Sequence, residues 1–155
     1  MEITLARALK YKNRLVGKIA AVADTIKRKN SIIKGAEREV DIDDLAALRV
    51  KLIKNLVQLK TEINQANGPI ISDIFQIAEL KSEIVFLNNI DTNHGKANRE
   101  YYRDAEPIEF EASMRFNEVE ALKTAANKEI DSIQEKIDKH NHLIHIDVVV
   151  LEDVY

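Results

Sequence analysis

Three histidines lie within six residues near the end of the chain, in the segment HNHLIHIDVVVLEDVY. Asp138, His142 and His145 follow one another by four and three residues, so one continuous helix would stack their side chains on one face. A carboxylate and two imidazoles suit Zn²⁺, Fe²⁺ or Ni²⁺ when another element completes the coordination. A metal site at Asp138, His142 and His145 is therefore one hypothesis for this stretch.

The same residues also fit the solvated face of a helix. Their stripe lies away from the apolar series Ile130, Ile133 and Ile137. Acid–histidine pairs one turn apart are favourable in water, and a histidine near a helix C-terminus complements the helix dipole. We favour this interpretation and expect no cofactor. His140 continues the apolar series and is expected in a core or at an interface.

Other signatures of catalysis are missing from the sequence. The letters HNH at 140–142 are adjacent, and adjacent helical residues point about 100° apart, so they cannot form a nuclease metal site. The chain has no cysteine, which excludes disulfides and thiolate ligands. It has no glycine-rich phosphate loop and no Glu-x-x-His pair. We expect a protein without enzymatic activity.

Charge is distributed unevenly along the chain. Residues 1–34 hold nine Lys and Arg against two acidic residues, whereas the remainder holds 14 basic and 24 acidic residues. Helical spacing places six of these cations opposite the apolar seam, as a basic stripe: Arg7, Lys10, Arg14, Lys18, Arg28 and Lys29. The stripe predicts contact with an acidic surface of this chain or of a protein partner. Binding of anionic lipid or nucleic acid is the alternative, with nucleic acid the less favoured of the two.

The spacing of apolar residues predicts a mainly α-helical chain. Glycine and proline divide it into four amphipathic helices, which we expect to form an antiparallel four-helix bundle or long helical hairpins. The predicted helices span residues 3–33, 43–66, 73–91 and 114–143. Apolar positions in steps of three and four, close to a heptad repeat, also favour coiled-coil association. The predicted inward seam of the first helix comprises Leu5, Leu9, Val16, Ile19, Ala23 and Ile26.

Two short strands are predicted beside the helices. Residues 107–112 alternate in polarity after Pro107, and residues 146–154 are rich in β-branched side chains. We expect these strands to pair, within one chain or between copies, because an unpaired terminal strand at 146–155 invites aggregation. A polar loop is predicted at 92–107. Its adjacent Tyr101 and Tyr102 suit either anchoring onto the helices or stacking with nucleic-acid bases.

Length and composition favour one soluble domain over residues 1–155. No stretch approaches the roughly 20 apolar residues that cross a bilayer, and no apolar signal sequence begins the chain. The absence of cysteine fits a reducing compartment. We therefore expect a cytoplasmic protein that forms homo-oligomers.

Three blocks of sequence are similar to a known group of proteins. They are ALKYKNRLVGKIA at 8–20, LKTEINQAN at 59–67 and AELKSEIVFLNNIDTNHG at 78–95. Together they resemble small α-helical proteins of bacterial and phage-associated origin, with a layout similar to septicolysin-like proteins. In that layout a helix ends in Ile-Asn-x-x-Asn, here residues 63–67, and a second helix, a loop and a terminal helix follow. The resemblance implies a helical fold and carries over no catalytic residue.

Overall fold

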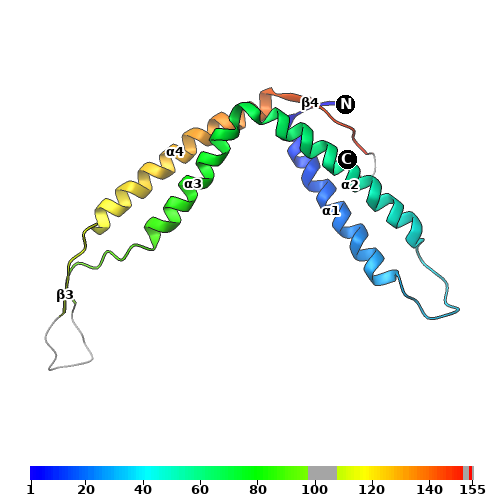
Figure 1. Cartoon of the computed structure of the whole chain (residues 1–155), viewed down its shortest axis with the longest axis horizontal. Helices are drawn as coiled ribbons and strands as arrows, with labels where there is room; N and C mark the ends of the chain where they lie inside the picture. Colours follow the sequence, from blue (N-terminus) through cyan, green and yellow to red (C-terminus); the bar gives the residue numbers. More distant parts are fainter. Residues whose placement is uncertain (98–107, 152–153, 155) are drawn as a thin grey trace. The chain divides into compact units, whose positions relative to one another are not determined.

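The structure, a computed structural model, describes residues 1–97, 108–151 and 154 (Figure 1). Its main elements are four helices in this part of the chain: α1 (Leu5–Lys29), α2 (Ile42–Ala66), α3 (Ile71–Asn88) and α4 (Phe116–Leu143). The prediction of a mainly helical chain is confirmed. None of these helices is both long and apolar enough to span a membrane within the described residues.

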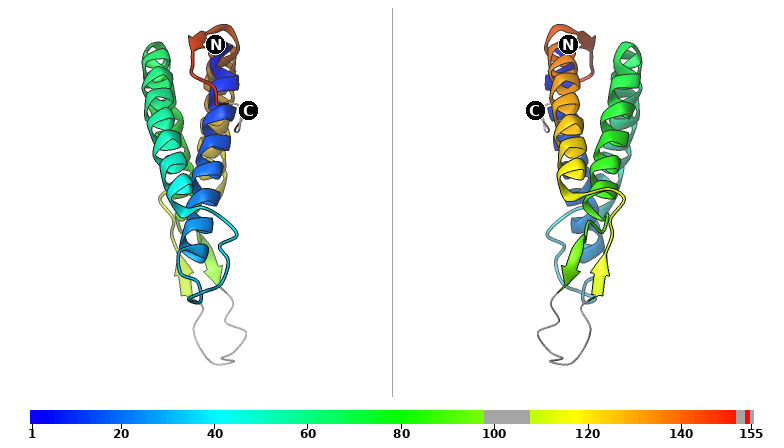
Figure 2. Two further views of the ribbon diagram at one scale, coloured as in Figure 1. Left: turned by 90° about the vertical axis from the view of Figure 1, so that its right-hand side faces the viewer. Right: turned by 90° about the vertical axis from the view of Figure 1, so that its left-hand side faces the viewer.

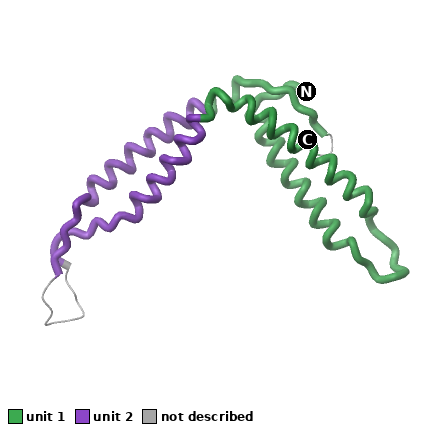
Figure 3. The backbone as a smooth tube through the Cα atoms, viewed as in Figure 1, with its two compact units in different colours: residues 1–71, 138–155 green, residues 72–137 purple. Residues whose placement is uncertain are grey.

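The chain divides into two compact units, each built on a helical hairpin (Figure 3). Unit 1 comprises residues 1–71 and 138–155 and holds α1, α2 and the last turns of α4. Unit 2 comprises residues 72–137 and holds the rest of α3 and α4. A single folding domain over residues 1–155 stays a prediction.

In unit 1, α1 and α2 lie side by side and antiparallel (Figures 1 and 2). The Asp41 side chain caps α2 by accepting hydrogen bonds from the backbone N–H groups of Asp43 (2.9 Å) and Asp44 (3.1 Å). These bonds satisfy donors that have no partner within the helix. The helix ends at Ala66, and a single 3₁₀ turn, η1 (Gly68–Ile70), holds the proline that cannot continue it.

The core of unit 1 overlaps the predicted seam of α1 but is centred beside it. Leu5 is buried, and Leu9, Ile19 and Ile26 are partly buried and pack against the core. The buried residues of α1 are Leu5, Ala8, Tyr11, Leu15 and Val22, which pack with Leu52, Leu59 and Ile63 of α2. Val16, predicted to face inward, is 45% exposed. Ala8, Tyr11, Leu15 and Val22 follow one another by three, four and seven residues, so they lie on one face that excludes Val16.

The chain ends of unit 1 meet in a small antiparallel sheet. Strand β1 (Glu2–Thr4) pairs with β4 (His145–Asp147), with Ile3 opposite Ile146. The predicted pairing of 107–112 with 146–154 is therefore wrong. Residues 3 and 4, predicted as the start of the first helix, belong to strand β1 instead. The reason is proximity: the backbone N–H of Leu5 donates to Ile144 O at 2.8 Å, so the start of α1 lies against the end of α4.

In unit 2, α3 and α4 form the second antiparallel hairpin (Figure 2). Strand β2 (Gly95–Ala97) pairs antiparallel with β3 (Ile108–Phe110), so the predicted strand at 107–112 has a local partner from inside the predicted loop 92–107. Helix α4 begins two residues later than predicted. The Glu118 carboxylate accepts the backbone N–H of Arg115 at 2.7 Å, half of a capping box.

Candidate interaction surfaces

The structure does not gather the predicted metal ligands. His145 lies beyond the end of α4, as the first residue of β4, so it does not continue the stack of Asp138 and His142. The His142 ring donates from Nδ1 to the backbone oxygen of Asp138 (2.7 Å), and His145 donates from Nδ1 to Leu143 O (3.1 Å). Among the described residues no group of three His, Cys, Asp or Glu side chains could hold a metal ion. The metal hypothesis stays a prediction without an assembled ligand set.

His140 has a structural partner within unit 1. It is half-buried, and its Nε2–H donates to the backbone oxygen of Ala66 at 2.9 Å. Ala66 is the last residue of α2, whose final carbonyls have no acceptor role inside the helix. His140 therefore fastens the end of α4 to the end of α2.

The basic stripe runs along α1, and two of its members form ion pairs with their own chain. Arg28 lies 3.6 Å from the Asp24 carboxylate, and Lys29 Nζ lies 2.6 Å from Glu39 Oε2. Arg7, Lys10 and Arg14 are exposed and Lys18 is half-buried. This supports the interpretation that part of the stripe meets acidic groups of the same chain. Tyr101 and Tyr102 lie outside the described residues.

The Lys29–Glu39 pair predicts a small, pH-dependent contribution to stability. The hydrogen bond and charge of Lys29 hold the pKa of the Glu39 carboxyl below its ordinary value. A carboxyl whose pKa is lower in the folded chain stabilises the fold above its unfolded pKa, and this stability is lost as the pH falls through the folded pKa. Glu39→Gln should therefore lower the free energy of unfolding slightly at neutral pH and leave it unchanged in acid. Because both groups are exposed, added salt should shrink the difference.

Denaturant unfolding of both proteins across the acid range, with an NMR titration of Glu39, measures this effect. A Glu39 pKa at or above that of an ordinary glutamate would contradict the prediction.

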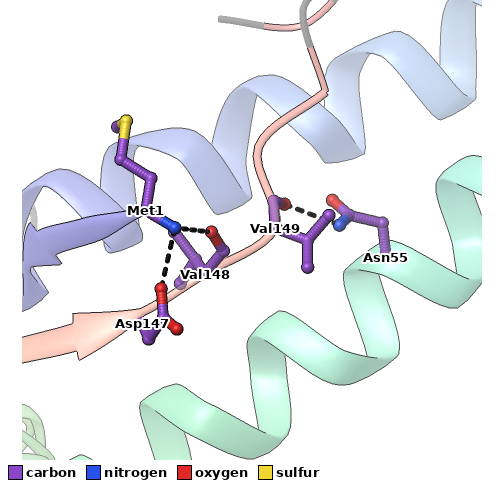
Figure 4. Close-up of polar contacts among 5 residues, drawn as sticks. All are labelled: Met1, Asn55, Asp147, Val148 and Val149. Carbon is purple, nitrogen blue, oxygen red and sulfur yellow. Dashed lines mark hydrogen bonds and ion pairs between the residues drawn. The ribbon is translucent and has the colours of Figure 1, made fainter.

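In unit 1, Met1 forms hydrogen bonds and an ion pair with Asp147 and Val148, at the end of β4 (Figure 4). The Met1 ammonium donates to Asp147 Oδ1 at 2.7 Å and to Val148 O at 2.9 Å, while Val148 N donates to Met1 O at 3.1 Å. The ammonium holds the pKa of the Asp147 carboxyl below its ordinary value. These contacts extend the β1–β4 ladder by one residue pair.

A buried polar pair, Tyr11 and Asn55, binds the extended backbone that follows. The Tyr11 hydroxyl donates to Asn55 Oδ1 (3.1 Å), and Asn55 Nδ2 donates to Val149 O (2.7 Å; Figure 4). The N–H of Leu151 donates to the Tyr11 hydroxyl at 2.9 Å. Asn55 is 8% exposed, and no other buried residue among those described has an amide or charged side chain. We call residues 148–151 the tail and these two side chains its clasp.

Sequence reasoning missed the clasp. Its one signal is the place of Asn55 in the series Leu48, Leu52, Asn55, Leu59, where three-four spacing requires an inward residue. A polar residue at such a position needs a hydrogen-bonding partner, because burying an unpaired amide is unfavourable. The sequence did not indicate that the partners are Tyr11 and the backbone of Val149, which is 94 residues away from Asn55.

Unit 2 exposes large apolar side chains along α3. Three-four spacing predicts an inward series of Ile74, Ile77, Leu80, Ile84 and Leu87. This is correct, since Ile77 and Leu87 are buried and the other three are half-buried. The other side of the helix carries Phe75 (63% exposed), Val85 (60%) and Phe86 (59%). We define the outer stripe of α3 as the exposed residues Phe75, Ala78, Ser82, Val85 and Phe86.

A second apolar area lies at the start of α4. Helical spacing places Phe116 at the start of the predicted inward series that continues through Val119 and Ile130. Phe116 is nevertheless 61% exposed because it is the first residue of the helix. Ser113, Met114, Glu118, Ala121 and Leu122 line an open hollow of about 490 Å³ beside it. The hollow is shallow and carries no group of titratable side chains beyond Glu118.

Comparison with known protein families, with curated proteins and with solved structures finds no match to this chain. The resemblance to septicolysin-like helical proteins therefore stays an expectation, and the functional argument depends on the surfaces described above.

Proposed function

We propose that this chain is a non-enzymatic scaffold protein that assembles into homo-oligomers through its helical surfaces. The observation that carries the proposal is the exposure of Phe75, Val85 and Phe86 on one side of α3. Contiguous apolar patches larger than a few hundred Å² are rare on monomeric soluble proteins, and the largest apolar patch of a protein is often a functional surface.

The architecture of unit 2 explains why such a surface arises. A helical hairpin buries the side chains between its two helices and leaves the remaining faces in solvent. A helix with apolar residues on one side can bury them against a single neighbouring helix. Helix α3 has apolar residues on two sides. A stable arrangement of such a helix needs another layer of protein.

The tail has a different role in this proposal. Because β4 pairs with β1 of the same chain and the clasp binds residues of the same chain, the tail stabilises the protomer. The expected bridging of copies by residues 146–155 has no support from these contacts. Assembly is assigned instead to the apolar side of α3.

Light scattering during size-exclusion chromatography tests the proposal. Over a hundredfold range of protein concentration, the mass should exceed the 17.7 kDa of one chain and rise with concentration toward a fixed multiple. A mass of one chain at every concentration would contradict the assembly function. Measuring at two salt concentrations separates apolar association, which salt does not weaken, from pairing through the basic stripe, which salt screens.

A further inference from the structure

The outer stripe of α3 has the spacing of a coiled-coil seam. A helix turns by about 100° per residue, so Phe75 and Phe86, eleven residues apart, lie three turns apart and within about 20° of each other. Between them, Ala78, Ser82 and Val85 follow Phe75 in steps of three, four and three. This alternation keeps the residues on one side of the helix and is the pattern by which two helices interlock.

The same helix has a complete inward seam. Ile77 and Ile84 differ by seven residues, and together with Leu87 they face away from the outer stripe. A helix that is apolar on both sides is characteristic of a protein interior. The inward seam of α3 faces α4, whereas the outer stripe has no neighbouring helix among the described residues.

We infer that the outer stripe packs against the outer stripe of a second copy of this chain. The inference rests on the proposed function and names the surface and the occupant of that assembly. Such an interface is isologous: the same residues of both copies meet about a two-fold axis.

The exposed area fits a pair of identical surfaces. A phenylalanine buries about 150–250 Å² when covered, so two phenylalanines and a valine that are three-fifths exposed present roughly 300 Å². One partner in a stable interface contributes about 800 Å², of which about 57% is apolar. The outer stripe alone supplies about two-thirds of that apolar area, and its flanks add the polar rim.

The size of the side chains also favours a second copy as the occupant. The five residues of the outer stripe are uncharged, and the exposed Glu79, which lies between Phe75 and Phe86 on the same side of α3, belongs to the rim, where its carboxylate stays in solvent. The small residues of the outer stripe, Ala78 and Ser82, lie in the middle, with the bulky Phe75 and Phe86 at the ends. Small central residues let two helix backbones approach closely while the large ends interlock.

Exchanging the phenylalanines tests the surface. The double variant Phe75→Ser/Phe86→Ser should reduce the mass in light scattering to that of one chain and keep the helical circular dichroism. Both side chains are exposed in the protomer, so folding does not depend on them. Phe116→Ser is the matched control: its side chain is equally exposed but lies outside the outer stripe, and it should leave the oligomer intact.

Disulfide trapping tests the contact directly, because the chain has no cysteine of its own. In a parallel pair of helices, Ser82→Cys alone should form a covalent dimer under oxidation. In an antiparallel pair, the covalent dimer should form instead when Ser82→Cys is mixed with Ala78→Cys. Ser132→Cys, an exposed serine on α4, should give none.

Two results would overturn the inference, and they are distinguishable. An oligomer that survives the double serine variant and gives no disulfide at 78 or 82 would exclude the outer stripe while the assembly function stands. A monomer at every concentration would exclude both.

Discussion

Leu15→Ala should lower the free energy of unfolding by about 3 kcal/mol, because it leaves a cavity in the core of unit 1 that the neighbours fill only in part. Leu15 is fully buried and packs with Tyr11, Val22 and Leu52 in one cluster. Small domains have a total stability of about 5–15 kcal/mol, so a loss of this size is a large fraction. Urea denaturation followed by circular dichroism, at a concentration where the protein is monomeric, measures it.

The neighbouring residue provides the control. Val16→Ala should change the free energy of unfolding by no more than about 0.5 kcal/mol, because the side chain is half-exposed and alanine favours a helix more than valine does. The heptad interpretation of the sequence, with Val16 inward, gives the opposite order. A larger loss for Val16→Ala than for Leu15→Ala would show that α1 presents its other side to the core.

The helices could be predicted because their signals are local. Three-four spacing of Ile and Leu, a capping aspartate at 41 or 43 and the Gly68-Pro69 stop predict α2 to within one residue at each end. The structure shows that Asp41 is the cap. The rotation of α1 about its axis could not be predicted as well. Its apolar residues extend around more than one side, and the predicted seam omitted four buried residues: Ala8, Tyr11, Leu15 and Val22.

The pairing of the strands could not be predicted for a topological reason. Strands of three residues, such as β1 and β2, are too short to show the alternation of apolar and polar side chains that identifies a strand. The spacing of apolar residues in Glu2–Thr4 also continues into that of the helix that follows. Their partners depend on which helix ends meet, and that is a property of the tertiary fold. The exposure of the outer stripe could not be predicted either. In the sequence, Phe75, Val85 and Phe86 have the same apolar character as the residues of α3 that face inward.

Asn55→Ala should lower the free energy of unfolding by about 2 kcal/mol, because it removes the donor to the part-buried Val149 carbonyl and the acceptor of the buried Tyr11 hydroxyl. The lost bonds are those of Asn55 with Val149 O and with the Tyr11 hydroxyl. Asn64→Ala, an exposed asparagine on the same helix, is the control and should be neutral or slightly stabilising. Equal effects of the two substitutions in urea denaturation would contradict the clasp.

Tyr11→Phe separates the hydrogen bonds of the clasp from its packing. The ring stays in the core, while the hydroxyl that accepts the Leu151 N–H and donates to Asn55 is lost. Because both side chains share these bonds, the two substitutions combined should cost less than the sum of their separate effects. Hydrogen exchange at the Leu151 amide should accelerate in Tyr11→Phe even where the whole protein stays folded, since that amide then has no acceptor. Unchanged exchange there would mean that packing of Val148 and Val154, both buried, holds the tail without the clasp.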